Sequence, residues 1–129
     1  LILASSGLPF TSLAFELVLE EAARSNLTHN ATICAYDRSG YGWSDPSTLY
    51  NTKRDVYLFN PPSCPFFFLM LLRDQIVVEL HSLLETAKVK SPYVLIGWSF
   101  GGWIVQAYAK KYPQVTTGIV CNYPTTCTL

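Results

Sequence analysis

The sequence predicts an α/β domain built on a four-stranded, mostly parallel sheet with flanking helices. Short apolar runs at residues 1–4, 31–36, 93–96 and 116–122 have the length and composition of buried strands. Helical segments are expected between these runs, at about residues 12–24, 74–88 and 99–112. Because strands that alternate with helices pair in parallel through right-handed crossovers, this order predicts an open parallel sheet.

Each expected helix carries local signals. The first helix gathers its apolar residues on one face: Phe15, Val18, Leu19 and Ala22. In the second helix, Asp74 is a suitable N-cap and the apolar residues from Ile76 to Ala87 recur on one side. The third helix starts with Gly101 and Gly102, which let it press close to the sheet, and Pro113 lies just beyond its end.

The size and composition of the chain limit the classes of protein to which it can belong. The 129 residues suffice for one small domain, and a chain that is 50% hydrophobic and 14% charged is packed rather than disordered. Nine basic and nine acidic residues cancel without a basic stripe, so no nucleic-acid partner is expected. The longest apolar run, residues 65–72, is too short for a transmembrane segment. The chain lacks an initiating Met and starts in a strand-like run, so we expect it to begin inside a larger protein.

The four cysteines form no Cys-x-x-Cys pair, so no metal site is predicted. Cys34 and Cys121 lie in strand-like runs and are expected to be small buried hydrophobic residues. Two glycosylation sequons, at Asn26 and Asn30, share one polar turn and weakly favour a secretory route. The localisation stays open.

The most informative motif is Gly97-Trp98-Ser99-Phe100-Gly101, which follows an apolar run and precedes a helical pattern. A strand that turns into a helix within so few residues strains the backbone at the serine and exposes its hydroxyl. We interpret Ser99 as a nucleophile and the main-chain N–H of Phe100 as an oxyanion donor. The alternative is a chance match on a tight turn.

Together with this motif, four blocks resemble the α/β-hydrolase superfamily in its order. They are residues 3–18, the Tyr36-Asp37-Arg38-Ser39-Gly40-Tyr41-Gly42-Trp43-Ser44-Asp45-Pro46 segment, residues 74–88 and residues 92–120. The resemblance implies a partial α/β-hydrolase fold over residues 1–129, holding the family's third to sixth strands in the order 4-3-5-6. It also implies a serine hydrolase at family level that needs no metal or organic cofactor.

The resemblance assigns roles by position. Ser99 matches the nucleophile, while Leu8 and Phe100 match the two main-chain donors of the oxyanion hole. Gly97, Trp98 and Gly101 complete the nucleophile elbow, where Trp98 packs beside the site or simply fills the core. Pro9-Phe10 departs from the family's glycine-rich pattern after Leu8 and stiffens that loop.

The loop block carries no catalytic assignment. The resemblance suggests that Asp37 and Arg38 hold the loop beside the site, with Arg38 paired to Asp37 or Asp45.

A base for Ser99 is missing from the sequence. No His, Asp or Glu follows Ser99, although the superfamily places its acid and His after the nucleophile. His29 and His81 lie upstream and are expected to be solvated surface residues. We therefore predict that the chain is the nucleophile-bearing part of a longer hydrolase, inactive alone and marginally stable because both sheet edges are open.

Residues 56–73 form an atypical insertion in the family pattern. Removing them joins residue 55 smoothly to residue 74, and the Arg-Asp pair at 54–55 recurs at 73–74. One hypothesis is a short intron translated in frame. The other is a genuine insertion that forms an apolar flap near the substrate.

Two functions therefore remain open. The first is hydrolysis by the full-length parent of a small-molecule carboxylic ester, with amides and lactones as further substrate classes. Members with an Asp nucleophile are disfavoured because residue 99 is Ser. The second is a non-catalytic hydrolase-like binding protein or a truncated gene model. A P-loop nucleotide binder is excluded because no Gly-Lys-Ser or Gly-Lys-Thr follows the glycines.

Overall fold

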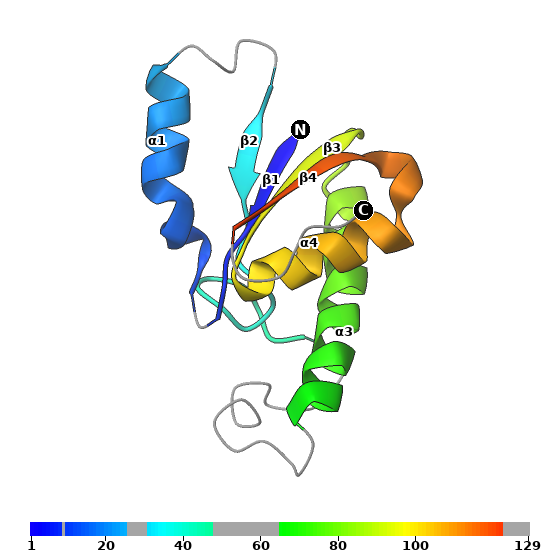
Figure 1. The fold of residues 1–129 in the computed structure, drawn as a ribbon. Coiled ribbons are helices and arrows are strands. Elements are labelled where there is room, and N and C mark those ends of the chain that lie inside the picture. Colours follow the sequence, from blue (N-terminus) through cyan, green and yellow to red (C-terminus); the bar gives the residue numbers. More distant parts are fainter. Residues whose placement is uncertain (9, 26–30, 48–64, 123–129) are drawn as a thin grey trace.

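The computed structural model describes residues 1–8, 10–25, 31–47 and 65–122. For residues 65–70 it describes the backbone alone. Four strands form one parallel sheet in the order β2-β1-β3-β4 (Figure 1). They are β1 (Ile2–Ser5), β2 (Ile33–Ala35), β3 (Tyr93–Trp98) and β4 (Thr116–Asn122). With β1 to β4 numbered as the third to sixth strands, as the resemblance implies, this arrangement is the predicted order 4-3-5-6.

Helices lie on both faces of this sheet (Figure 1). One face carries the 3-10 helix η1 (Ser12–Phe15) and α1 (Glu16–Arg24), and the other carries α3 (Pro65–Thr86) and α4 (Phe100–Lys111). A short 3-10 helix, η2 (Pro113–Val115), leads from α4 into β4. Pro113 thus ends α4 where the sequence predicts, since proline cannot donate the next helical hydrogen bond.

The hydrophobic core lies between the sheet and the α3–α4 layer. Side chains of the central strand β3 alternate between buried and partly buried positions, and Leu95 at its middle is fully buried. From α4, Ile104, Val105 and Tyr108 are also fully buried in this cluster. Removing this apolar surface from water is the main stabilising contribution to the fold.

Helix α3 is longer than predicted, and Asp74 is not its N-cap. The helix begins at Pro65, where proline is tolerated because the first N–H groups of a helix have no intrahelical partner. Asp74 lies inside the helix and accepts a hydrogen bond from Arg73 Nε at 2.8 Å. Leu72 enters the core at 5% exposure, whereas Leu71 is 54% exposed.

This helix also bears on the atypical insertion. Residues 65–73 of the insertion form the first turns of α3. Residues 56–64 of the insertion lie outside the described part of the chain. The translated intron and the apolar flap both stay predictions.

No helix among the described residues has the length and apolar character needed to cross a membrane.

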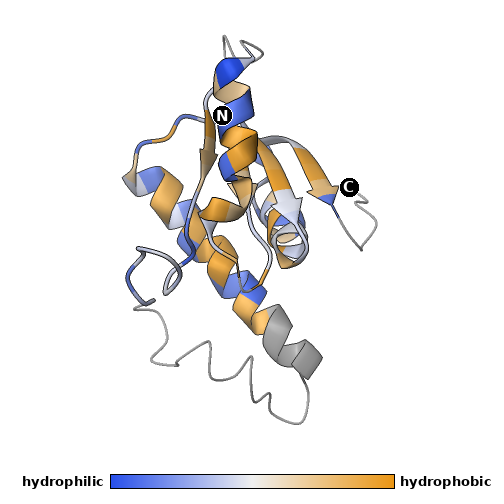
Figure 2. Ribbon diagram, turned by 90° about the vertical axis from the view of Figure 1, so that its left-hand side faces the viewer, coloured by the Kyte–Doolittle hydropathy of each residue, from blue (hydrophilic) through white to orange (hydrophobic). Residues whose placement is uncertain are grey.

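The sheet face beneath α1 is only partly covered. Phe15 is buried as predicted, but Val18 is 50% exposed and Leu17 on the same helix is 79% exposed. Figure 2 turns this side of the molecule toward the viewer, and apolar residues are visible along α1 and on the strands beside it. No residue of α1 itself is buried, so the apolar face predicted for residues 12–24 buries only Phe15, which belongs to η1.

His81 is not the solvated surface residue that the sequence predicts. Its Nδ1 lies 3.0 Å from the Tyr108 hydroxyl, and its ring stacks on Tyr112 with 3.7 Å between centroids. Burial raises the pKa of Tyr108, so its hydroxyl keeps its proton and can donate a hydrogen bond to His81 Nδ1. These contacts join α3 to α4. The other histidine, His29, lies outside the described residues.

The two strand cysteines differ from each other. Cys34 is a free thiol that packs against the core but is only partly buried, so it is less buried than expected. Cys121 is disulfide-bonded, so the expectation of a simple buried hydrophobic residue is wrong there. Apolar neighbours in the sequence could not reveal this bond, because pairing depends on which sulfur atoms meet in space.

Candidate active site

Ser99 occupies the single-residue turn between β3 and α4. Its backbone has φ 54° and ψ −123°, a left-handed φ that is costly for a residue with a Cβ. The Ser99 N–H donates to the Asn122 carbonyl at 3.0 Å, and the Ser99 carbonyl accepts from the Gly102 N–H at 2.9 Å. These bonds to β4 and α4 hold the serine in its strained conformation at the carboxyl edge of the sheet.

Two glycines permit the close approach of strand and helix at this turn. A Cβ on Gly97 would lie 2.5 Å from the Gly101 carbonyl oxygen. A Cβ on Gly101 would lie 2.0 Å from the Ser5 carbonyl oxygen. Because both contacts involve backbone atoms, no side-chain movement could relieve them. The tight junction of β1, β3 and α4 therefore requires glycine at both positions.

The loop after β1 lies directly against Ser99. A Cβ on Gly7 would come within 2.8 Å of Ser99 Cβ and 3.3 Å of Ser99 Oγ. Leu8 follows Gly7 in this loop, and Phe100 is the first residue of α4. The structure thus brings the Gly7–Leu8 peptide, the serine and the positive N-terminal end of α4 to one place.

Arg38 holds this loop, but not through the predicted ion pair. Its guanidinium donates to the carbonyl oxygens of Ser6 at 2.5 Å, Gly7 at 3.1 Å and Phe10 at 3.0 Å. The side chain is 3% exposed and lies over the Tyr41 ring, 4.5 Å from its centroid. Backbone carbonyls therefore take the place of the expected carboxylate of Asp37 or Asp45.

Asp37 fastens the other end of the same loop. Its Oδ1 accepts a hydrogen bond from the Ser12 N–H at 2.6 Å. Burial acts to raise the pKa of Asp37, but hydrogen bonds from Ser12 and Trp43 and the charge of Arg38 outweigh it, so the pKa is lowered. Gly42 packs against this carboxylate with φ +52°, where a Cβ would collide with it.

The lowered pKa of Asp37 predicts an acid-sensitive part of the stability. A carboxylate whose pKa is lower in the folded state stabilises the fold above its unfolded pKa of about 3.9, and this contribution is lost as pH falls through the folded pKa. Urea midpoints measured from about pH 6 to pH 3 should fall less steeply for Asp37→Asn than for the parent chain. The exposed Asp45→Asn is the matched control, and equal acid profiles for parent and Asp37→Asn would contradict the assignment.

The loop after β2 is tied to α3 by a network that the sequence did not reveal. Glu79 accepts hydrogen bonds from Ser39 Oγ at 3.0 Å, from Gln75 Nε2 at 3.0 Å and from Ser47 Oγ. The signal in the sequence is the spacing of Gln75 and Glu79, which places them on one helix face. Their partners come from a loop at least 28 positions away, and only the fold brings them together.

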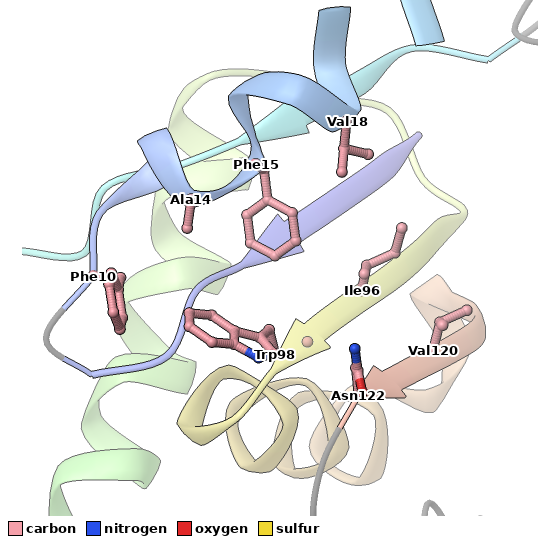
Figure 3. Close-up of a pocket in the computed structure, with 9 residues that line it drawn as sticks. Phe10, Ala14, Phe15, Val18, Ile96, Trp98, Val120 and Asn122 are labelled. Atoms are coloured by element: carbon pink, nitrogen blue, oxygen red, sulfur yellow. The ribbon is translucent and has the colours of Figure 1, made fainter. Parts of the chain in front are cut away.

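Trp98 faces a cavity on the α1 side of the sheet (Figure 3). The cavity measures about 600 Å³ and lies between Phe15, Val18 and the ends of β3 and β4. Its lining is apolar apart from Asn122. The rings of Trp98 and Phe10 pack with 4.9 Å between centroids, so Trp98 supports the loop that follows β1.

The described residues place no histidine next to Ser99. His81 contacts Tyr108, which lies nine residues further along the chain than Ser99, or about 13 Å along the helix axis. Within residues 1–8, 10–25, 31–47 and 65–122, no three His, Cys, Asp or Glu side chains converge as a metal site would need.

Comparison with known proteins agrees with this architecture. A family model described as alpha/beta hydrolase fold matches residues 2–127. The chain belongs to the α/β-hydrolase family. No significant match was found among curated proteins.

Several solved structures have a fold similar to that of this hydrolase-family chain. They include Cfl2 from Burkholderia cenocepacia (18% identity, TM-score 0.66) and an alpha/beta superfamily hydrolase from Oenococcus oeni PSU-1 (23%, 0.60). A third is juvenile hormone epoxide hydrolase from the silkworm Bombyx mori (20%, 0.65). The alignments cover 99%, 93% and 94% of this chain but only 37%, 36% and 27% of those chains, respectively.

Proposed function

We propose that this chain forms the nucleophile-bearing part of a serine hydrolase that cleaves small carboxylic esters, with Ser99 as the nucleophile. Amides and lactones share the same acyl chemistry and are further substrate classes. The chain spans 37% or less of its solved relatives, so the proposal concerns a longer parent that supplies the remaining groups.

The observation that carries the proposal is the backbone of Ser99. A left-handed φ of 54° in a serine costs free energy, and the surrounding hydrogen bonds from β4 and α4 maintain it. Such strain at a sharp strand-to-helix turn is the geometry that presents a nucleophile, known as a nucleophile elbow. Gly97 and Gly101 provide the close approach that this elbow needs.

Two main-chain donors would stabilise the negative charge that develops on the substrate oxygen. In this proposal the Phe100 N–H and the Leu8 N–H donate to the oxyanion, aided by the positive end of α4. The neighbourhood of Gly7 and Ser99 supports this assignment.

The proton of Ser99 requires a base from outside this chain. No His follows Ser99 in the sequence, and the contacts of His81 lie far along α4. A serine hydroxyl without a base is a weak nucleophile, so the 129-residue chain alone should show little turnover. The competing proposal is a non-catalytic hydrolase-like binding protein with the same fold.

A fluorophosphonate probe separates these two functions. We expect the folded full-length parent to be labelled on the tryptic peptide 91–110, whose only serines are Ser91 and Ser99. Fragment masses should place the adduct on Ser99, with Ser91 in the same peptide as an internal control. A folded parent that remains unlabelled would support the binding protein instead.

A further inference from the structure

Arg38 places a buried positive charge behind the loop that faces Ser99. The side chain is 3% exposed, and all of its hydrogen bonds described here go to neutral groups of that loop. Nη1 binds the Ser6 carbonyl and hydroxyl, and Nη2 binds the carbonyls of Gly7 and Phe10. A buried charge is expensive to desolvate, and simpler polar side chains could hold a loop. The arrangement therefore points to a role for the charged, forked guanidinium group.

The peptide between Gly7 and Leu8 links this charge to the candidate oxyanion hole. The Gly7 carbonyl, which accepts from Arg38 at 3.1 Å, and the Leu8 N–H belong to the same peptide unit. In a trans peptide these two groups point in opposite directions. Holding the carbonyl toward Arg38 therefore turns the N–H to the side away from the guanidinium. Gly7 itself lies against Ser99.

The same bond also strengthens the donor. A charge-assisted hydrogen bond to a carbonyl withdraws electron density from its peptide, and linked hydrogen bonds polarise one another in a low-dielectric setting. The Leu8 N–H thus becomes a stronger donor to a developing negative charge. Lysine could not reproduce this effect, because it lacks the planar fork that reaches Ser6, Gly7 and Phe10 together.

We propose that Arg38 is a positioning residue that orients and polarises the Gly7–Leu8 peptide as an oxyanion donor. This inference rests on the proposed hydrolase function. Arg38 acts through the peptide and does not touch the substrate.

The test uses the full-length parent and a matched pair of substrates, a p-nitrophenyl ester and its thionoester. We expect Arg38→Gln to lower kcat for the ester by about 10- to 100-fold with little change in KM, because it weakens one oxyanion donor. Sulfur accepts hydrogen bonds weakly, so Arg38→Gln should lower kcat for the thionoester much less. Arg24→Gln, on an exposed side chain of α1, is the control and should leave both rates unchanged.

The outcomes separate the two proposals. If the parent shows no Ser99-dependent hydrolysis or labelling, the proposed function fails. If the parent is active but Arg38→Gln lowers kcat equally for both substrates, or for neither, only the role of Arg38 is overturned. If Arg38→Gln does not fold, Arg38→Lys decides, since it keeps the charge without the fork and should show the same selective loss for the ester.

Discussion

Replacing Ser99 by glycine should abolish the proposed ester hydrolysis by the full-length parent while making the protein more stable. Loss of a nucleophile typically lowers kcat by a factor of about 10⁶, and at least about 10³ is expected here. Glycine adopts φ 54° without steric cost, so relief of the strain should add about 1 kcal/mol to the free energy of unfolding. Hydrolysis of a p-nitrophenyl ester and urea unfolding measure the two effects.

The opposite signs of these effects exclude misfolding as the cause of inactivity. Ser99→Ala keeps the strain and should be equally inactive without the gain in stability. Ser82→Ala, at an exposed position of α3, is the control and should change neither quantity. Substantial activity in Ser99→Gly would remove the serine from the mechanism. An unchanged or lower stability would mean that the backbone at this turn is not strained.

Replacing Gly101 by alanine should destabilise the fold by about 3 kcal/mol or more. The added Cβ would lie 2.0 Å from the Ser5 carbonyl oxygen, so α4 must move away from β1 or the sheet must distort. Few single substitutions meet backbone atoms so directly, and this loss would be large against the marginal stability expected of the chain. Urea unfolding followed by circular dichroism measures the shift.

The chain offers a matched glycine as the control for this experiment. A Cβ on Gly118 in β4 would meet no atom within 4 Å. Gly118→Ala should therefore cause no loss, and a gain of up to about 1 kcal/mol is expected because alanine restricts the unfolded chain. Equal effects of the two substitutions would show that the approach of α4 to β1 is looser than described here.

Patterns within short segments predicted most of the fold. All four strands lie where apolar runs occur, and their order follows from the family resemblance. The start of α3 was wrong because Asp74 has the chemistry of an N-cap, while the apolar residues before it continue the helix back to Pro65. Local preference for a cap was overridden by a helix that buries Leu72 in the core.

Contacts between distant segments could not be predicted in the same way. Arg38 was expected to meet a carboxylate, yet it binds three carbonyls of a loop that lies 28 to 32 positions earlier. His81 was expected in solvent, yet it meets Tyr108 across the α3–α4 contact. Both errors arise because charge and polarity define which partners suit a side chain, while the fold decides which partners are near.

The sequence by itself determined the alternation of strands and helices, the glycines of the tight turn and the serine between them, because these depend on neighbours along the chain. Only the tertiary structure decided that Gly7 lies against Ser99, that Arg38 supports that loop and that Glu79 joins α3 to the residues after β2. The physical reason is that side chains from separate segments acquire defined distances only when the parallel sheet brings the carboxyl ends of its strands to one edge.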